Sequence, residues 1–251
     1  MNVVEAAAIG AAAITAGTIN AVVGSGTLIT FPTLLAFGYP PVLANVSNSI
    51  GLVPGTLSAA YGYRRELRGQ LRRVLRFGAG SLLGGVLGAL LLLELPSGAF
   101  DAVVPVLILG GCVLVLLQPR LNAWLKKRES IGDGDGGVPL WLGVFGTGVY
   151  GGYFGAAQGV ILMGLFGTFL KDDLQRLNGV KNVLASIVNG VSAVVFIAAV
   201  HVDWAAVVVI AVGSTIGGLV GARVGRKLPP TALRGIIVAV GVTAATVLAL
   251  T

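Results

Sequence analysis

Glycines and hydrogen-bonding side chains interrupt the apolar stretches of this sequence at two places. The first is "NAVVGSGTLITFPTLLAFGYPPVLANVSNSIGLVPG", residues 20–55, where Gly24-Ser25-Gly26 precedes a cluster of Asn and Ser. The second is "FGAAQGVILMG", residues 154–164, which contains Gln158 and Gly159. Glycine tolerates conformations that other residues do not, so both places favour a helix break. A helix that restarts after a break exposes N–H groups and a positive dipole end, which together favour an anion.

Polar side chains follow each break at helical intervals and are expected to share one face of a helix. Lys181 matters most among them, because a lysine at mid-bilayer costs roughly 2.5–3.5 kcal/mol on insertion scales and requires a partner. That partner is an anionic substrate or the Asp172-Asp173 pair; alternatively, Lys181 reaches the interface and only helps to set topology. The polar residues after the two breaks are Asn45, Ser47, Asn48 and Ser49, then Asn178, Lys181, Asn182, Ser186 and Asn189.

The residues that intramembrane proteolysis or cation binding would need are missing from this sequence. An intramembrane serine protease would need Ser25 beside a histidine at membrane depth, and the single histidine, His201, lies at the end of an apolar run. Cation sites in membranes usually show carboxylates, and the apolar runs hold essentially none. We therefore expect no catalytic residue, no metal ligand and no cofactor.

Composition identifies an integral membrane protein. Of 251 residues, 55% are hydrophobic and only 11% charged, whereas soluble domains carry about a quarter charged residues. The net charge of +7 does not indicate nucleic acid, because the basic residues lie in short loops, where they set orientation. The 39 glycines favour close helix packing, within the bundle or between copies of a homo-oligomer.

An internal repeat divides the chain. "GSLLGGVLGA" (80–89) matches "GSTIGGLVGA" (213–222) at a shift of 133 residues, and "LANVSNSIGLVPGTLSAA" (43–60) falls on residues 177–194 with one residue inserted. We expect a first membrane repeat over 1–118, a cytoplasmic linker over 119–137 and a second repeat over 138–251. The predicted helical segments are 3–23, 27–37, 42–62, 74–93 and 99–118, then 138–155, 159–170, 178–200, 204–222 and 232–250.

Loop charges indicate that the second repeat is inverted. The loop "YRRELRGQLRR" (63–73) is basic, but its counterpart "VHVDW" (200–204) has no Lys or Arg. Conversely, "ELPSGAFD" (94–101) is acidic and its counterpart "RVGRKLPPTALR" (223–234) is basic. Equivalent loops should therefore face opposite sides of the membrane, as in many secondary transporters. Both termini would face outward and the linker inward.

At these motifs the chain resembles a known family. "VVGSGTLITFPTLLAFGYPPVLANVSNSIGLVPGTLSAAYGYRR", "NGVKNVLASIVNGVSAVV" and "GSTIGGLVGARVGRKLP" are similar to the two half-signatures of the TauE/SafE sulfite exporter (TSUP) family of membrane permeases. The resemblance implies transport of sulfite, thiosulfate or small organosulfonates across the prokaryotic cytoplasmic membrane. The resemblance also implies that Pro32, which matches the first motif, belongs to the family's functional residues. The chain departs from the family pattern at Thr27, where many relatives have Gly, and in the second break, "GAAQG".

Together these arguments predict an all-α permease that works by alternating access, one half rocking against the other. Its partners would be a lipid bilayer and a small sulfur-containing anion. The alternatives are another small anion such as a carboxylate, or a cation or metal permease. The expected substrate-binding residues are Gly24, Ser25, Gly26, Thr27, Asn45, Asn48, Ser49, Gln158, Gly159, Asn178, Lys181, Asn182 and Asn189.

Overall fold

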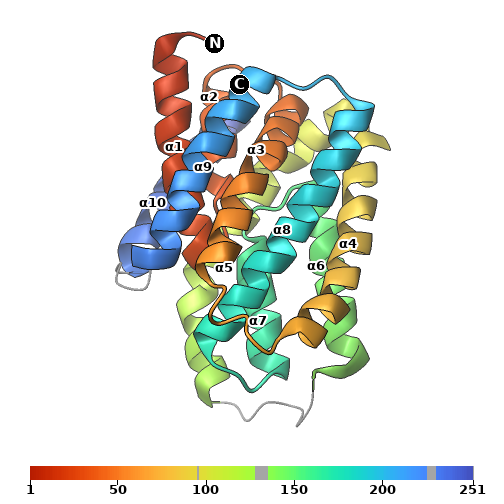
Figure 1. The fold of residues 1–251 in the computed structure, drawn as a ribbon. Coiled ribbons are helices and arrows are strands. Elements are labelled where there is room, and N and C mark those ends of the chain that lie inside the picture. Colours follow the sequence, from red (N-terminus) through yellow and green to blue (C-terminus); the bar gives the residue numbers. More distant parts are fainter. Residues whose placement is uncertain (95, 128–134, 225–229, 251) are drawn as a thin grey trace.

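A computed structural model describes residues 1–94, 96–127, 135–224 and 230–250, and all of its secondary-structure elements in these ranges are α-helices (Figure 1). Five of them are long and apolar enough to cross a membrane: α1, α4, most of α5, α8 and α9. The predicted all-α membrane architecture is therefore confirmed. The helices are α1 Val3–Val22, α2 Thr27–Ala36, α3 Pro41–Gly62, α4 Leu71–Glu94, α5 Ser97–Lys127, α6 Gly137–Tyr153, α7 Gln158–Phe169, α8 Leu174–Ala199, α9 Trp204–Val224 and α10 Pro230–Leu250.

Two helix boundaries differ from the predicted segments by more than three residues. Helix α8 begins at Leu174 because the Asp173 carboxylate accepts hydrogen bonds from the N–H groups of Gln175 and Arg176. Lys181 consequently lies about two turns inside the helix. Helix α5 continues through Pro119 to Lys127, into the predicted linker, because a proline removes one helical hydrogen bond without always ending the helix.

The two short helices turn back instead of crossing the bundle. Helix α1 runs from the end that holds both termini towards the middle, and α2 returns to that same end; α6 and α7 do the same from the opposite end (Figure 1). Contacts agree with these paths. Tyr39, just after α2, lies close to Asp203, just before α9, and its burial together with that carboxylate raises the pKa of Tyr39. Arg73 pairs with both Asp135, before α6, and Asp172, after α7.

Asp172 anchors the end of α7 to the start of α4. Its carboxylate accepts from Arg73 Nη1 at 2.6 Å and from Arg176 Nε at 2.9 Å. Burial alone would raise the pKa of Asp172, but the hydrogen bonds from Arg73 and from the Asp173 N–H, with the charges of the two arginines, outweigh it and lower the pKa. The carboxylate therefore stays charged at neutral pH and holds the two loops together.

Helix contacts exchange between the two halves of the chain. Helix α1 packs on α9 as α6 packs on α4, and α3 packs on α9 as α8 packs on α4. Likewise, α5 contacts α7 as α10 contacts α2. This pairing supports a structural repeat in which helices of one half pack between helices of the other. The opposite orientation of the two halves in a membrane remains a prediction.

The matching glycine motifs perform the same packing in each half. A Cβ added to Gly88 of α4 would lie 2.0 Å from the Val149 carbonyl oxygen of α6, and one added to Gly217 of α9 would lie 2.0 Å from that of Ile14 in α1. The backbones approach closely only because both residues lack a side chain. The glycine stripes thus lie inside the bundle.

Gly217→Ala should lower the melting temperature of the purified protein, because the new methyl group meets a backbone carbonyl that cannot rotate away. Overpacking of this kind costs about 1–3 kcal/mol. Gly190→Ala is the matched control, since nothing lies within 4 Å of a Cβ at that helical position. Equal melting temperatures for the two variants would show that close approach of α1 and α9 does not stabilise the fold.

Candidate functional site

The two predicted breaks meet as backbone against backbone. The Gly159 N–H donates to the Gly24 carbonyl oxygen at 3.0 Å. A Cβ on Gly24 would lie 2.4 Å from Gly159 Cα, and one on Gly159 would lie 2.5 Å from Gly24 Cα. Gly24 and Gly155 turn the chain with φ of +86° and +79°, in the left-handed region that favours glycine. Glycine is therefore required on both sides of this crossing.

Four helix ends gather at the crossing. Helices α1 and α6 end just before the breaks, and α2 and α7 begin just after them. From there α2 and α7 run towards opposite ends of the bundle (Figure 1), so their N-termini face each other. Most of the first N–H groups of α2 and α7 are bonded to carbonyls of the breaks themselves, but each helix start still carries a positive dipole end. Two such ends at one point favour a negative charge between them.

Side chains from α8 satisfy the C-terminal carbonyls of α1. Lys181 Nζ donates to the Asn20 oxygen at 3.1 Å and to the Ala21 oxygen at 3.3 Å. Asn178 and Asn182 also donate to the Ala21 oxygen, at 3.2 and 3.1 Å. Lys181 is completely buried, so its ammonium offsets the negative end of α1. Neither Asp172 nor Asp173 is its partner: the first pairs with Arg73 and Arg176, and the second caps α8.

Side chains from α3 hold the end of α6 and the start of α2. Asn45 Nδ2 donates to the Tyr153 carbonyl oxygen at the end of α6, at 2.9 Å. Asn48 donates to Thr27 Oγ1 at 3.3 Å and accepts from Thr30, which ties α3 to the first turns of α2. The third helix of each half thus supports the first helix of the other half, because Asn45 reaches α6 while Asn178, Lys181 and Asn182 reach α1.

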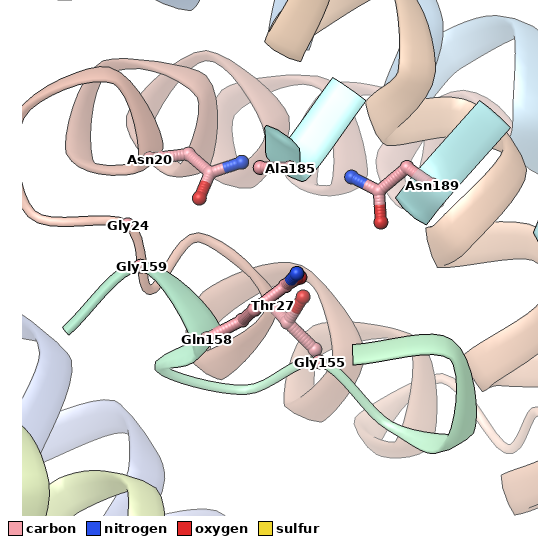
Figure 2. Close-up of a pocket in the computed structure, with 8 residues that line it drawn as sticks. All are labelled: Asn20, Gly24, Thr27, Gly155, Gln158, Gly159, Ala185 and Asn189. Atoms are coloured by element: carbon pink, nitrogen blue, oxygen red, sulfur yellow. The ribbon is translucent and has the colours of Figure 1, made fainter. Parts of the chain in front are cut away.

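A small polar cavity lies beside the crossing (Figure 2). Its volume is about 10 Å³, which accommodates about one water molecule. Asn20 and Asn189 face Thr27 and Gln158 across it (Figure 2). None of the described residues that line it is charged. They are Asn20, Gly24, Thr27, Gly155, Gln158, Gly159, Ala185 and Asn189.

The predicted site residues fall into two groups. Gly24, Thr27, Gln158, Gly159 and Asn189 line the cavity. The others do not line it. Gly26 packs on the Ala16 carbonyl, Ser25 is buried within the first break, and Ser49 is buried in α3. The supporting contacts described above are made by Asn45, Asn48, Asn178, Lys181 and Asn182.

Asn20 and Ala185 line the cavity but were not among the residues predicted from the sequence. Asn20 lies one helical turn before Gly24, and that spacing is a signal from which it could have been found. Ala185 has no functional group that would mark it. Gly155 belongs to the second break and joins the lining through its left-handed conformation.

Gly24→Ala should destabilise the protein more than Gly38→Ala. The two glycines have nearly equal φ, +86° and +81°, but a Cβ at Gly38 meets nothing within 4 Å. Both variants incur the left-handed strain of about 1–2 kcal/mol, and only Gly24→Ala adds a clash with Gly159, worth about another 1–3 kcal/mol. Thermal unfolding in detergent measures the difference; equal losses would contradict the backbone crossing.

Comparisons with known proteins agree with this architecture. The family model described as "Sulfite exporter TauE/SafE" matches residues 9–248. A "Probable membrane transporter protein" of Haemophilus influenzae is 29% identical over 226 residues, which cover 88% of this chain and 85% of that protein. "Probable membrane transporter protein YfcA" of Escherichia coli K12 is 29% identical over 222 residues, 86% of this chain and 80% of that protein.

A shorter match and the search of solved structures complete the comparison. "Probable membrane transporter protein ORF9" of Sinorhizobium is 32% identical over 111 residues, covering 44% of this chain and 42% of that protein. No solved structure matches the chain significantly. The family match extends over nearly the whole chain, and the helices suit a bilayer. The chain therefore belongs to the TauE/SafE sulfite exporter family and is a multi-pass membrane transporter of the cell membrane.

Proposed function

We propose that this transporter carries a small sulfur-containing anion, such as sulfite, thiosulfate or a small organosulfonate, across the cytoplasmic membrane by alternating access. The anion binds in the cavity between Asn20, Thr27, Gln158 and Asn189. One observation carries the proposal: two half-length helices begin head to head at a polar cavity whose described lining contains no acidic residue. Paired helix N-termini direct positive potential at the same anion, and the carboxamides of the lining supply side-chain donors.

Charge around the cavity favours an anion over a cation. The negative end of α1 is offset by Lys181 and two asparagines, whereas the positive ends of α2 and α7 face the cavity. Lys181 also lies close beneath the lining, because a Cβ on Gly159 would be 3.0 Å from Lys181 Cδ. Its ammonium therefore acts on the site through the electric field and through the position of α1, without lining the cavity.

Gln158 is ready to bind a ligand oxygen. It is 4% exposed and begins α7, and its Nε2 has no hydrogen-bond partner among the described residues. A buried amide without a partner costs about 1–3 kcal/mol, and an anion oxygen in the cavity would remove that cost.

The family description supports sulfur in the substrate, since it names sulfite. A sulfur oxyanion presents several oxygen acceptors, and the cavity is surrounded by several donors. With room for about one water, the cavity of about 10 Å³ must widen to admit such an ion. That widening is the step in which one side of the site opens, as alternating access requires.

Sulfite or thiosulfate should raise the melting temperature of the purified protein, while acetate at equal ionic strength should not. An anion at ~100 times its dissociation constant stabilises the folded state by about 2.7 kcal/mol. Gln158→Leu should weaken the shift, because it removes the unpaired amide. Uptake of radiolabelled sulfite into proteoliposomes then tests transport directly.

Gln118→Leu is the matched control for Gln158→Leu. Gln118 is also buried, also has an amide atom without a partner among the described residues, and lies in α5 away from the cavity lining. It should keep the wild-type anion response. A response to acetate alone would replace the sulfur anion by a carboxylate, and no response to any anion from folded protein would refute anion binding.

A further inference from the structure

The two breaks correspond in length and in their first glycine, although Ala157 is left-handed (φ +58°) where Gly26 is right-handed (φ −60°). The side chains beside the breaks are exchanged. Gly24 and Gly155 share the left-handed turn, and α2 and α7 begin three residues later, at Thr27 and Gln158. This alignment places Asn20 of α1 opposite Gly151 of α6. The first half therefore has a carboxamide before its break and a short side chain after it. The second half has no side chain before its break and a carboxamide after it.

The carboxamide of Gln158 fills the space that a side chain at position 151 would occupy. A Cβ on Gly151 would lie 2.5 Å from Gln158 Cδ, 2.6 Å from Oε1 and 2.7 Å from Nε2. In the first half, Asn20 occupies the corresponding position and Thr27 is short enough to leave it free. Each half thus delivers one carboxamide to its own break, and both line the cavity (Figure 2).

We propose that the anion is held between these two carboxamides, one from each half, and that Asn20 is the specificity-determining residue of the first half. The inference rests on the proposed anion transport and adds how the substrate is recognised. Each amide offers two N–H donors. Donors on opposite sides suit an oxyanion whose oxygens point in several directions, as in sulfite, better than a carboxylate whose oxygens lie at one end.

The two roles of Asn20 are separable by mutation. Its backbone carbonyl accepts from Lys181 Nζ at 3.1 Å and so belongs to the cap of α1. Its side chain lines the cavity. A change of the side chain therefore leaves the carbonyl and its partner in place, and a loss of binding can be distinguished from a loss of structure.

Asn20→Ala should weaken sulfite binding about tenfold, the equivalent of 1.4 kcal/mol, without lowering the melting temperature of the anion-free protein. Sulfite titrations followed by thermal shift measure both quantities. Asn20→Asp should weaken binding further, because a carboxylate would face the anion. A purely structural residue would instead lower the anion-free melting temperature.

An exchange variant tests the correspondence between the halves. Gln158→Thr alone should weaken sulfite binding, and Gly151→Asn added to it should restore binding, because the pair rebuilds the first-half arrangement in the second half. Unchanged sulfite binding in Asn20→Ala, or no restoration by Gly151→Asn, would overturn the carboxamide pair while anion transport stood. No sulfite response in the wild type would instead overturn the proposed function.

Discussion

Direct contact between the backbones of Gly24 and Gly159 sets the level at which four helices end or begin. Because neither residue has a side chain, the turn after α1 and the start of α7 can cross and share a hydrogen bond of 3.0 Å. That crossing brings the starts of α2 and α7 together and places Gln158 and Thr27 at one cavity. Without it, each helix start would stand alone, and a single helix N-terminus is a weaker anion site than two.

Negative helix C-termini and positive helix N-termini meet at this level, and only the C-termini are covered by side chains that neutralise them. The α1 carbonyls are covered by Lys181 and two asparagines, and Asn45 covers the end of α6. The starts of α2 and α7 present their positive dipole ends to the cavity, although most of their first N–H groups are bonded within the same turn and that of Gly159 is bonded to Gly24. Lys181 comes from the second half, and no lysine takes the corresponding place in the first half. The charge around the site is therefore not symmetric, although the backbone arrangement is repeated. Lys181 also couples the two, since it binds the residue, Asn20, whose side chain lines the cavity.

The helices and breaks were predictable because they depend on local sequence: apolar runs gave the spans, glycines gave the turns, and the repeated decapeptide gave the packing stripe. The hydrogen-bond partners of Lys181 could not be predicted in this way. Its partners lie 160 and 161 residues away along the chain, and no spacing within its own helix distinguishes a carbonyl partner from an anion. Asn20 was missed although it lies one helical turn before Gly24, because the prediction considered only the polar residues that follow each break.

Packing also bears on how the site can open. The closest backbone contacts join α1 to α9 and α4 to α6, through Gly217 and Gly88. Rocking of one sequence half against the other would separate those helix pairs and lose many close van der Waals contacts. Movement between the group α1, α3 and α9 and the group α4, α6 and α8 would leave them intact. Between these groups lie the α3–α8 interface, the glycine crossing, and the hydrogen bonds of Lys181 to α1 and of Asn45 to α6, which such a movement would have to exchange. Movement of these mixed groups, each drawn from both halves, would therefore exchange polar contacts at the centre and keep the closest glycine contacts.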